Sequence, residues 1–180
     1  MDTRDDTPAP ARTRVVDWQD PKPALELRYR MKGLQYLQGV VDGRIPAPPI
    51  SRLMNLRLVE VERGRAVFEM TPDESHYNPL GMVHGGVAAT ILDSAMGCSL
   101  HSLLEPDDRY TTIEMKVNYL KAMTTATGRV RGTGTIVHLG RTTGPIRRTP
   151  RRRGRYALRA RHVHAADQAR RAPIGGAPTG

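Results

Sequence analysis

The 180-residue chain contains a single cysteine, Cys98, and no apolar run of the roughly 18 residues that a membrane span needs. One cysteine excludes an intramolecular disulfide and provides no cysteine-based metal cluster, so a reducing compartment is expected. The first ten residues are polar and acidic, without the apolar segment of a secretory signal. We therefore expect a cytoplasmic protein with no membrane contact and no bound metal.

Short motifs of several common enzyme classes are also missing. The sequence has no G-x-S-x-G, H-E-x-x-H, G-x-x-x-x-G-K-[ST] or G-x-G-x-x-G pattern. It therefore gives no sign of a serine hydrolase, a zinc protease, a P-loop protein or a Rossmann dinucleotide-binding protein. Cys98 lies in an apolar segment, where packing is a more natural role than nucleophilic attack.

The formal net charge of +10 is unevenly distributed along the chain. Residues 141–180 contain 11 arginines and one acidic residue, Asp167, whereas residues 1–140 contain equal numbers of basic and acidic residues. Such a tail would give salt-dependent, non-specific binding to nucleic acid. Its only aromatic residue is Tyr156, so base stacking is unsupported and such binding is expected to be incidental.

Composition divides the chain into three segments. Residues 1–23 are rich in Pro, Asp and Arg without hydrophobic periodicity, which predicts a disordered N-terminal segment. Residues 24–141 carry helical and strand patterns and form the one predicted domain. Residues 142–180 are rich in Arg, Ala, Gly and Pro, which predicts a disordered tail that cannot build a core.

Within the domain, hydrophobic spacing predicts helices and strands in the order helix, two strands, long helix, two strands. The expected elements are helices at 24–42 and 85–104, a helical turn near 51–55, and strands at 56–62, 65–71, 110–121 and 127–139. Arg63-Gly64 is the expected hairpin turn, and residues 72–84 form a loop before the long helix. This order predicts an α+β domain with an antiparallel sheet.

The stretch H-Y-N-P-L-G-M-V-H-G-G-V-A-A-T-I-L-D, residues 76–93, carries the candidate chemistry. Gly85 and Gly86 open the predicted long helix, whose first N–H groups suit a carbonyl oxygen that gains negative charge. Asp93 follows about two turns later, roughly 12 Å along the axis. A carboxylate in an apolar helix is costly unless it is paired or functional, so Asp93 is a candidate general base or nucleophile.

Each of these residues also has an interpretation without function. The glycine pair fits a simple loop-to-helix transition, and Asp93 fits a structural carboxylate bonded to a neighbouring loop. His84 fits a buried histidine that holds the loop, and Asn78 is a common turn residue. The separation between Gly85 and Asp93 also prevents both from gripping one small group within the same helix, unless a substrate or a second subunit bridges them.

The spacing of these residues in one segment is more specific for a family than any of the residues alone. The segment N-P-L-G-M-V-H-G-G-V-A-A-T-I-L-D-S-A-M-G, from Asn78 to Gly97, resembles the motif of the hotdog-fold thioesterases of the phenylacetate-pathway (PaaI-like) family. That motif reads N-x-x-G-x-x-H-G-G, then six residues, then an acidic residue. The segments Y-T-T-I-E-M-K-V-N-Y-L-K-A and G-T-I-V-H-L-G-R are similar to the next two strands of the family. The resemblance covers residues 25–141.

The resemblance implies a hotdog fold, a long central helix wrapped by an antiparallel sheet. It also implies homodimers or homotetramers with the active site between subunits, so that Gly85 of one subunit and Asp93 of the other act on one thioester. The resemblance further implies that the Gly85 N–H and Asn78 polarise the thioester carbonyl. It implies that Asp93 activates water or attacks the thioester directly. His84 orients the loop, and a strand hydroxyl, best matched by Thr111, helps to hold the water.

The implied substrate is an aryl- or medium-chain acyl-CoA, hydrolysed to the free acid and coenzyme A. No separate cofactor is expected, because coenzyme A is part of the substrate. Lys121 and Arg141 lie near strand ends where the family meets the coenzyme A phosphates. Two alternatives stay open: a hotdog dehydratase or non-catalytic acyl-CoA binder, and an inactive truncated hotdog protein whose Arg-rich tail binds nucleic acid.

The end of the chain departs from the family pattern, which continues with two more strands ending in a segment similar to L-Y-A-H-A-T-S-T. Codons can be chosen for residues 157–166 that give L-Y-A-H-A-T-S-T when read one nucleotide later. We therefore hypothesise a frameshift soon after Arg141, in the gene or in its recorded sequence. Loss of those strands would leave unpaired backbone groups, so an unstable or inactive product is expected.

Overall fold

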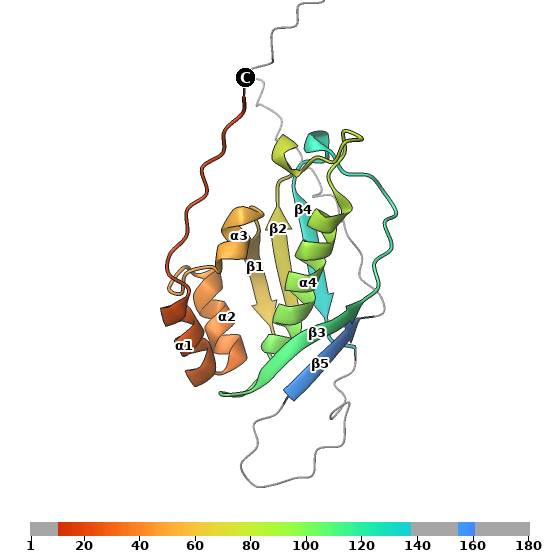
Figure 1. Ribbon diagram of the computed structural model, residues 1–180. Helices are drawn as coiled ribbons and strands as arrows, with labels where there is room; N and C mark the ends of the chain where they lie inside the picture. The colour runs from red at the N-terminus through yellow and green to blue at the C-terminus, as the bar shows by residue number, and fades with distance from the viewer. Residues whose placement is uncertain (1–10, 138–154, 161–180) are drawn as a thin grey trace, which may run out of the picture.

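The computed structural model of the protein describes residues 11–137 and 155–160 (Figure 1). The helices are α1 (Lys22–Arg30), α2 (Gly33–Val41), α3 (Pro49–Leu53) and α4 (Gly85–His101), with short 3₁₀ turns η1 (Glu74–His76) and η2 (Thr125–Thr127). The strands are β1 (Arg57–Glu62), β2 (Arg65–Met70), β3 (Arg109–Met115), β4 (Val130–Thr135) and β5 (Arg155–Ala160).

The core lies between α4 and a three-stranded antiparallel sheet of order β1-β2-β4, against which α4 packs (Figure 1). Ile91 and Ala95 of α4 and Ala66 of β2 are fully buried there. The helix lies very close to β4, since a Cβ on Gly134 would be 2.2 Å from the carbonyl oxygen of Ala95. The long helix and the antiparallel sheet confirm the predicted α+β class.

The predicted hairpin joins β1 and β2 at Arg63-Gly64, where Gly64 has a φ of 76°. The N–H of Gly64 donates to Ser102 Oγ at 2.7 Å, and the Ser102 hydroxyl in turn donates to the Ser99 carbonyl at 2.7 Å. Ser102 and Ser99 are buried. The hairpin turn is thereby attached to the last turn of α4.

The single helix predicted over residues 24–42 is two helices, which corrects the sequence interpretation. Met31 and Lys32 between them are extended, with ψ angles of 155° and 139°. The break lets the Gly33 N–H donate to the Leu104 carbonyl at 2.9 Å. A Cβ on Gly33 would lie 1.7 Å from the His101 carbonyl oxygen, so α2 starts in direct backbone contact with the end of α4.

The C-terminal end of α4 holds an aromatic cluster around the buried His101. The His101 ring stacks on Tyr36, with centroids 5.4 Å apart, and lies 5.8 Å from the ring of Tyr110. Burial, with a smaller effect of the Arg28 cation, lowers the pKa of His101 to about 4. Burial, with a smaller effect of Asp93, raises the pKa of Cys98 to about 12, so this residue is a packing thiol at neutral pH.

Strand β3 pairs with β5, and the two cross α4 on the side away from the three-stranded sheet (Figure 1). The pair is parallel, with Arg109 opposite Arg155, whereas only antiparallel pairing was expected. β3 also ends at Met115 rather than near residue 121. Residues 155–160, which lie within the predicted tail, form β5, and strand pairing of this kind uses backbone groups and needs no apolar pattern.

The rest of the predicted tail, with Arg141, lies outside the described residues, as do residues 1–10. The frameshift hypothesis therefore stays a prediction, which the nucleotide sequence of the gene tests: codons that cannot yield L-Y-A-H-A-T in the shifted frame would contradict it.

Residues 11–20 form neither helix nor strand, yet they are attached to the domain by Arg14. The Arg14 guanidinium donates to Ser75 Oγ at 3.1 Å and to the carbonyl oxygens of Arg52 and Leu53 at 3.2 and 3.1 Å. Each bond to an exposed partner is weak alone, but three from one planar side chain fix its direction. The N-terminal segment is thus linked to the turn η1, which begins the loop before α4.

Candidate active site

The loop from Asp73 to His84 delivers the chain to the N-terminus of α4, and its shape is set by His76. This side chain is buried, and its Nδ1 accepts a hydrogen bond from the Asp73 N–H at 3.0 Å. The His76 carbonyl accepts from the His84 N–H at 2.8 Å. A buried residue therefore joins both ends of the loop.

Asn78 shapes the middle of the same loop. Its Oδ1 accepts hydrogen bonds from the N–H groups of Leu80 and Met82, at 2.9 and 3.3 Å. The Asn78 N–H donates to the Met82 carbonyl at 2.7 Å. Because the oxygen is used inside the loop, the part of Asn78 left for a ligand carbonyl is the NH₂ group, a donor.

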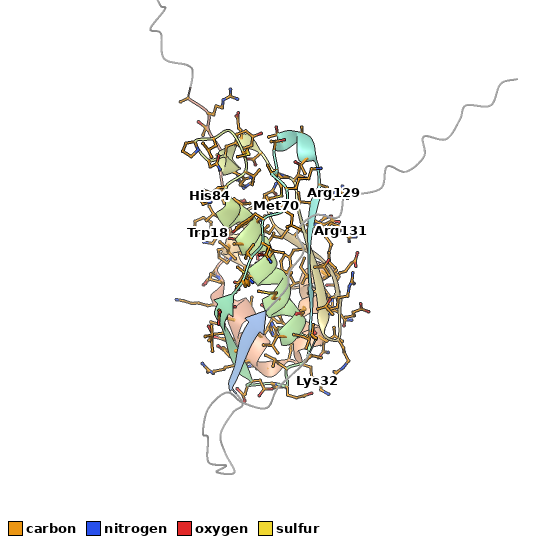
Figure 2. All side chains as sticks on the ribbon, turned by 90° about the vertical axis from the view of Figure 1, so that its right-hand side faces the viewer. Trp18, Lys32, Met70, His84, Arg129 and Arg131 are labelled. Carbon is orange, nitrogen blue, oxygen red and sulfur yellow. The ribbon has the colours of Figure 1, made fainter. Side chains whose placement is uncertain are left out.

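His84 is exposed and serves as the N-cap of α4, which corrects the expectation of a buried histidine. Its Nδ1 accepts from the Gly86 N–H at 2.9 Å and so satisfies one of the unpaired donors of the first turn. Its carbonyl accepts from the Val87 N–H at 2.9 Å. Figure 2 shows His84 at the end of α4 where Met70 also lies, with Lys32 toward the opposite end. The buried histidine of the loop is His76 instead.

Gly85 is the first residue of α4, so its N–H has no carbonyl one turn earlier in the helix to which it could donate. The Tyr119 ring lies against it: a Cβ on Gly85 would be 3.2 Å from Tyr119 Cζ. The Tyr119 hydroxyl donates to the Gly85 carbonyl at 3.2 Å. A side chain at this position would press on the Tyr119 ring, which would have to move by a few tenths of an ångström.

Asp93 lies on the exposed side of α4, although most of the helix is buried. Its Oδ1 accepts a hydrogen bond from the Thr112 hydroxyl at 2.8 Å. Thr111, the residue predicted for this role, is exposed on the neighbouring position of β3. Consecutive strand residues point to opposite faces, and the face of β3 that meets α4 contains Tyr110 and Thr112.

The structure thus gathers Asn78, His84 and Gly85 at the N-terminus of α4, while Asp93 lies about two turns further along. Lys121 is exposed, two residues after Tyr119 in the segment that contacts this N-terminus. Arg141, the other residue expected to meet phosphates, lies outside the described residues.

Sequence reasoning missed His76, Thr112 and Tyr119. His76 stands at the start of the quoted stretch, and a histidine two residues before a loop asparagine could have indicated an anchoring role. Tyr119 lies 34 residues after Gly85, and no local pattern connects the two. Thr112 differs from the predicted Thr111 by one strand position, which only the observed face of β3 distinguishes.

Within residues 11–137 and 155–160, no group of three or more His, Cys, Asp or Glu residues is placed to hold a metal ion. In the same part of the chain, no helix has the length and apolar character to cross a membrane. The groups that the described site offers are a helix N-terminus, the Asn78 amide and the Asp93 carboxylate.

Comparisons with known proteins point to one family. Residues 80–147 match the family model described as the thioesterase superfamily. The chain is 28% identical over 94 residues to the 1,4-dihydroxy-2-naphthoyl-CoA hydrolase of Listeria monocytogenes, which covers 52% of this chain and 75% of that protein. It is also 28% identical over 87 residues to acyl-coenzyme A thioesterase 13 of Homo sapiens, covering 48% of this chain and 61% of that protein.

Solved structures agree on the fold. A thioesterase family protein from Silicibacter pomeroyi matches with a TM-score of 0.52 and 28% identity, over 59% of this chain and 76% of that one. A phenylacetic acid degradation-related protein from Ralstonia eutropha matches with a TM-score of 0.53 at 21% identity, over 59% of this chain and 80% of that one, and shows the fold alone. The described domain therefore has the predicted hotdog fold, and residues 80–147 are similar to the thioesterase superfamily.

Proposed function

We propose that the protein hydrolyses an aryl- or medium-chain acyl-CoA to the free acid and coenzyme A. The observation that supports this most strongly is the N-terminus of α4, where Gly85 is a helix residue whose N–H needs an acceptor from outside the helix. In the proposed reaction, this N–H donates to the thioester oxygen as it gains negative charge. The positive end of the helix dipole stabilises the same charge.

Asn78 is the second donor of the proposed oxyanion site. Its side-chain oxygen is held by two backbone N–H groups, which fixes the amide plane and leaves the NH₂ group to donate. His84 supports the site indirectly, since it caps the Gly86 N–H and thereby orients the first turn. Donors that are fixed before the reaction avoid the cost of reorienting when the negative charge forms.

Asp93 is the proposed general base, which takes a proton from the attacking water, or the nucleophile that attacks the thioester directly. The exposure of its carboxylate leaves one oxygen accessible while Thr112 holds the other. Because Asp93 lies roughly 12 Å from Gly85 along the helix, we propose that the base of each site comes from a second copy of the chain. Size-exclusion chromatography with light scattering tests this, because a monomer that retains full activity would contradict it.

The acyl-CoA substrate class is supported by the relatives, two of which are named for hydrolysis of CoA thioesters. Lys121 is the proposed contact for a coenzyme A phosphate, because it is an exposed cation beside the segment that meets the helix N-terminus. No separate cofactor is proposed. We also propose a cytoplasmic location, in keeping with the single cysteine.

The deciding experiment measures coenzyme A release from a panel of aryl- and medium-chain acyl-CoAs with the wild type and Asp93→Asn. The amide cannot take a proton, so kcat should fall by about 10²- to 10⁴-fold while the thermal midpoint changes little. Asp42→Asn is the matched control, because Asp42 pairs with Arg44 in the exposed turn after α2. Equal turnover by Asp93→Asn would remove Asp93 from the mechanism, and no turnover by the wild type would contradict the function.

A further inference from the structure

Tyr119 lies outside every regular element, in the segment after β3, yet it makes two contacts with the helix N-terminus. Its hydroxyl donates to the Gly85 carbonyl at 3.2 Å. Its ring lies beside the position of a Cβ on residue 85, with Cζ, Cε1 and the hydroxyl oxygen 3.2, 3.3 and 3.4 Å from that position. The hydroxyl and the ring of Tyr119 therefore both contact Gly85, whose N–H is the proposed donor to the oxyanion.

This contact matters because glycine has the least restricted backbone of all residues. A donor that stabilises a transition state has to point in one direction before the charge appears, and a glycine N–H does so only when its neighbours hold it. The peptide group before Gly85 is held through the His84 carbonyl, which accepts from the Val87 N–H at 2.9 Å.

The peptide group after Gly85 is held on both sides. Its N–H, that of Gly86, donates to His84 Nδ1 at 2.9 Å, and its carbonyl accepts from the Tyr119 hydroxyl at 3.2 Å. Of these bonds, only the one from Tyr119 comes from outside the helix and its cap. Removing it would leave the Gly85–Gly86 peptide group held by the His84 cap and the helix.

The Tyr119 ring is open to solvent on the side away from Gly85. Its side chain is 61% exposed, although one side of the ring is covered by Gly85. The adjacent Leu120 is 83% exposed, and Leu80 of the loop is 77% exposed. An aromatic ring that touches the donor residue on one side and is open on the other suits a position beside a bound thioester.

We infer that Tyr119 is a positioning residue, which holds the Gly85–Gly86 peptide group through its hydrogen bond to the Gly85 carbonyl and so limits the backbone rotation of the residue that carries the donor N–H. The inference rests on the proposed function, since the Gly85 N–H is the donor in that reaction. Tyr119 does not take or give a proton in it. Its effect should therefore appear in kcat and not in substrate affinity, because the donor acts mainly on the charge of the transition state.

The test compares the wild type with Tyr119→Phe, which removes the hydroxyl and keeps the ring, and with Tyr29→Phe as the matched control. Tyr29 lies on α1 beside Arg28 and Arg109, toward the opposite end of α4. Loss of one hydrogen bond predicts a three- to tenfold lower kcat for Tyr119→Phe, with KM within about twofold. Tyr29→Phe should retain the kcat of the wild type. An unchanged kcat in Tyr119→Phe would overturn the inference.

A second readout does not depend on activity. The ¹³C′ resonance of Gly85 should move upfield in Tyr119→Phe, since a carbonyl that loses a hydrogen bond is less polarised, and it should stay in place in Tyr29→Phe. If the wild type hydrolyses no thioester, the proposed function fails, while the resonance still decides whether Tyr119 holds Gly85. An unmoved Gly85 resonance would overturn the inference whatever the activity.

Discussion

The two ends of α4 differ in residue type and in burial. The N-terminal end has two glycines, an exposed histidine cap and a loop whose polar groups bond to one another. The C-terminal end is buried, with Leu100, His101 and Ser102 at most 5% exposed and an aromatic cluster around His101. One helix therefore carries an accessible set of donors at one end and a closely packed anchor at the other.

This difference shows how the fold can keep an unpaired donor in place. An accessible N–H at a helix start contributes little to stability, and glycine there adds backbone freedom. The contacts of the other end compensate, because α2 and the β1–β2 turn are bonded to Leu104 and Ser102, which directly follow α4. Substitutions at the C-terminal end should therefore change stability, and substitutions at the N-terminal end should change activity.

Gly33→Ala is expected to have the largest effect. Its Cβ would lie 1.7 Å from the His101 carbonyl, and two backbones would have to separate, which should cost about 3 kcal/mol or more of unfolding free energy. Urea denaturation measures this. Gly39→Ala in the same helix is the control, because the three atoms nearest to its Cβ belong to the Ile45 side chain and none of them is a backbone atom. Equal losses in the two variants would show that the contact between α2 and α4 is not tight.

His101→Phe should alter the pH dependence of stability. The pKa of His101 is lowered to about 4 in the folded chain, mainly by burial, from its ordinary value of 6.5. Protonation therefore favours the unfolded chain, so the contribution is fully present above pH 6.5 and is lost as the pH falls toward 4. The loss amounts to about 3 kcal/mol at most.

The phenylalanine variant keeps a ring against Tyr36 but cannot be protonated. Its unfolding free energy should therefore decline less than that of the wild type between pH 6.5 and pH 5. Chemical denaturation at several pH values measures the difference. Parallel curves for the two proteins would contradict the buried, neutral state of His101.

Thr112→Val should have the smallest effect. It tests the candidate site and not the packed C-terminal end of α4. Loss of the hydroxyl that holds Asp93 Oδ1 should lower kcat about three- to tenfold, with unfolding free energy within about 0.5 kcal/mol of the wild type. Thr133→Val, on the exposed part of β4, is the control for loss of a hydroxyl. A larger effect from Thr111→Val than from Thr112→Val would favour the assignment made from sequence.

Much of the fold was predictable because it depends on local patterns. The β1–β2 hairpin follows from two strand patterns around Arg63-Gly64, and α4 starts at Gly85, where it was predicted to begin. The break between α1 and α2 was not predictable, since apolar spacing continues across Met31 and Lys32. The cause of the break is a contact between Gly33 and the end of α4, nearly 70 residues away.

In the candidate site too, local spacing was predictable from the sequence and tertiary contacts were not. The predictions for Asn78, Gly85 and Asp93 rest on a fixed spacing that places them on one loop and one helix, as the structure has them. Thr111 was carried over from the family resemblance, and a difference of one strand position changes the face on which a side chain lies, so Thr112 holds Asp93 instead. Lys121, also carried over from the resemblance, stays a prediction. The two partners that the structure adds, Thr112 for Asp93 and Tyr119 for Gly85, are tertiary contacts made by the chain after α4.

The bond between the Gly64 N–H and the Ser102 hydroxyl has a consequence for solvent exchange. Amide protons in hairpin turns usually exchange quickly, because water reaches them without unfolding. The acceptor here is 2% exposed and belongs to the anchored end of α4. The amide proton of Gly64 should therefore exchange only when α4 separates from the sheet, and its exchange rate would report the opening of the whole domain from a single turn.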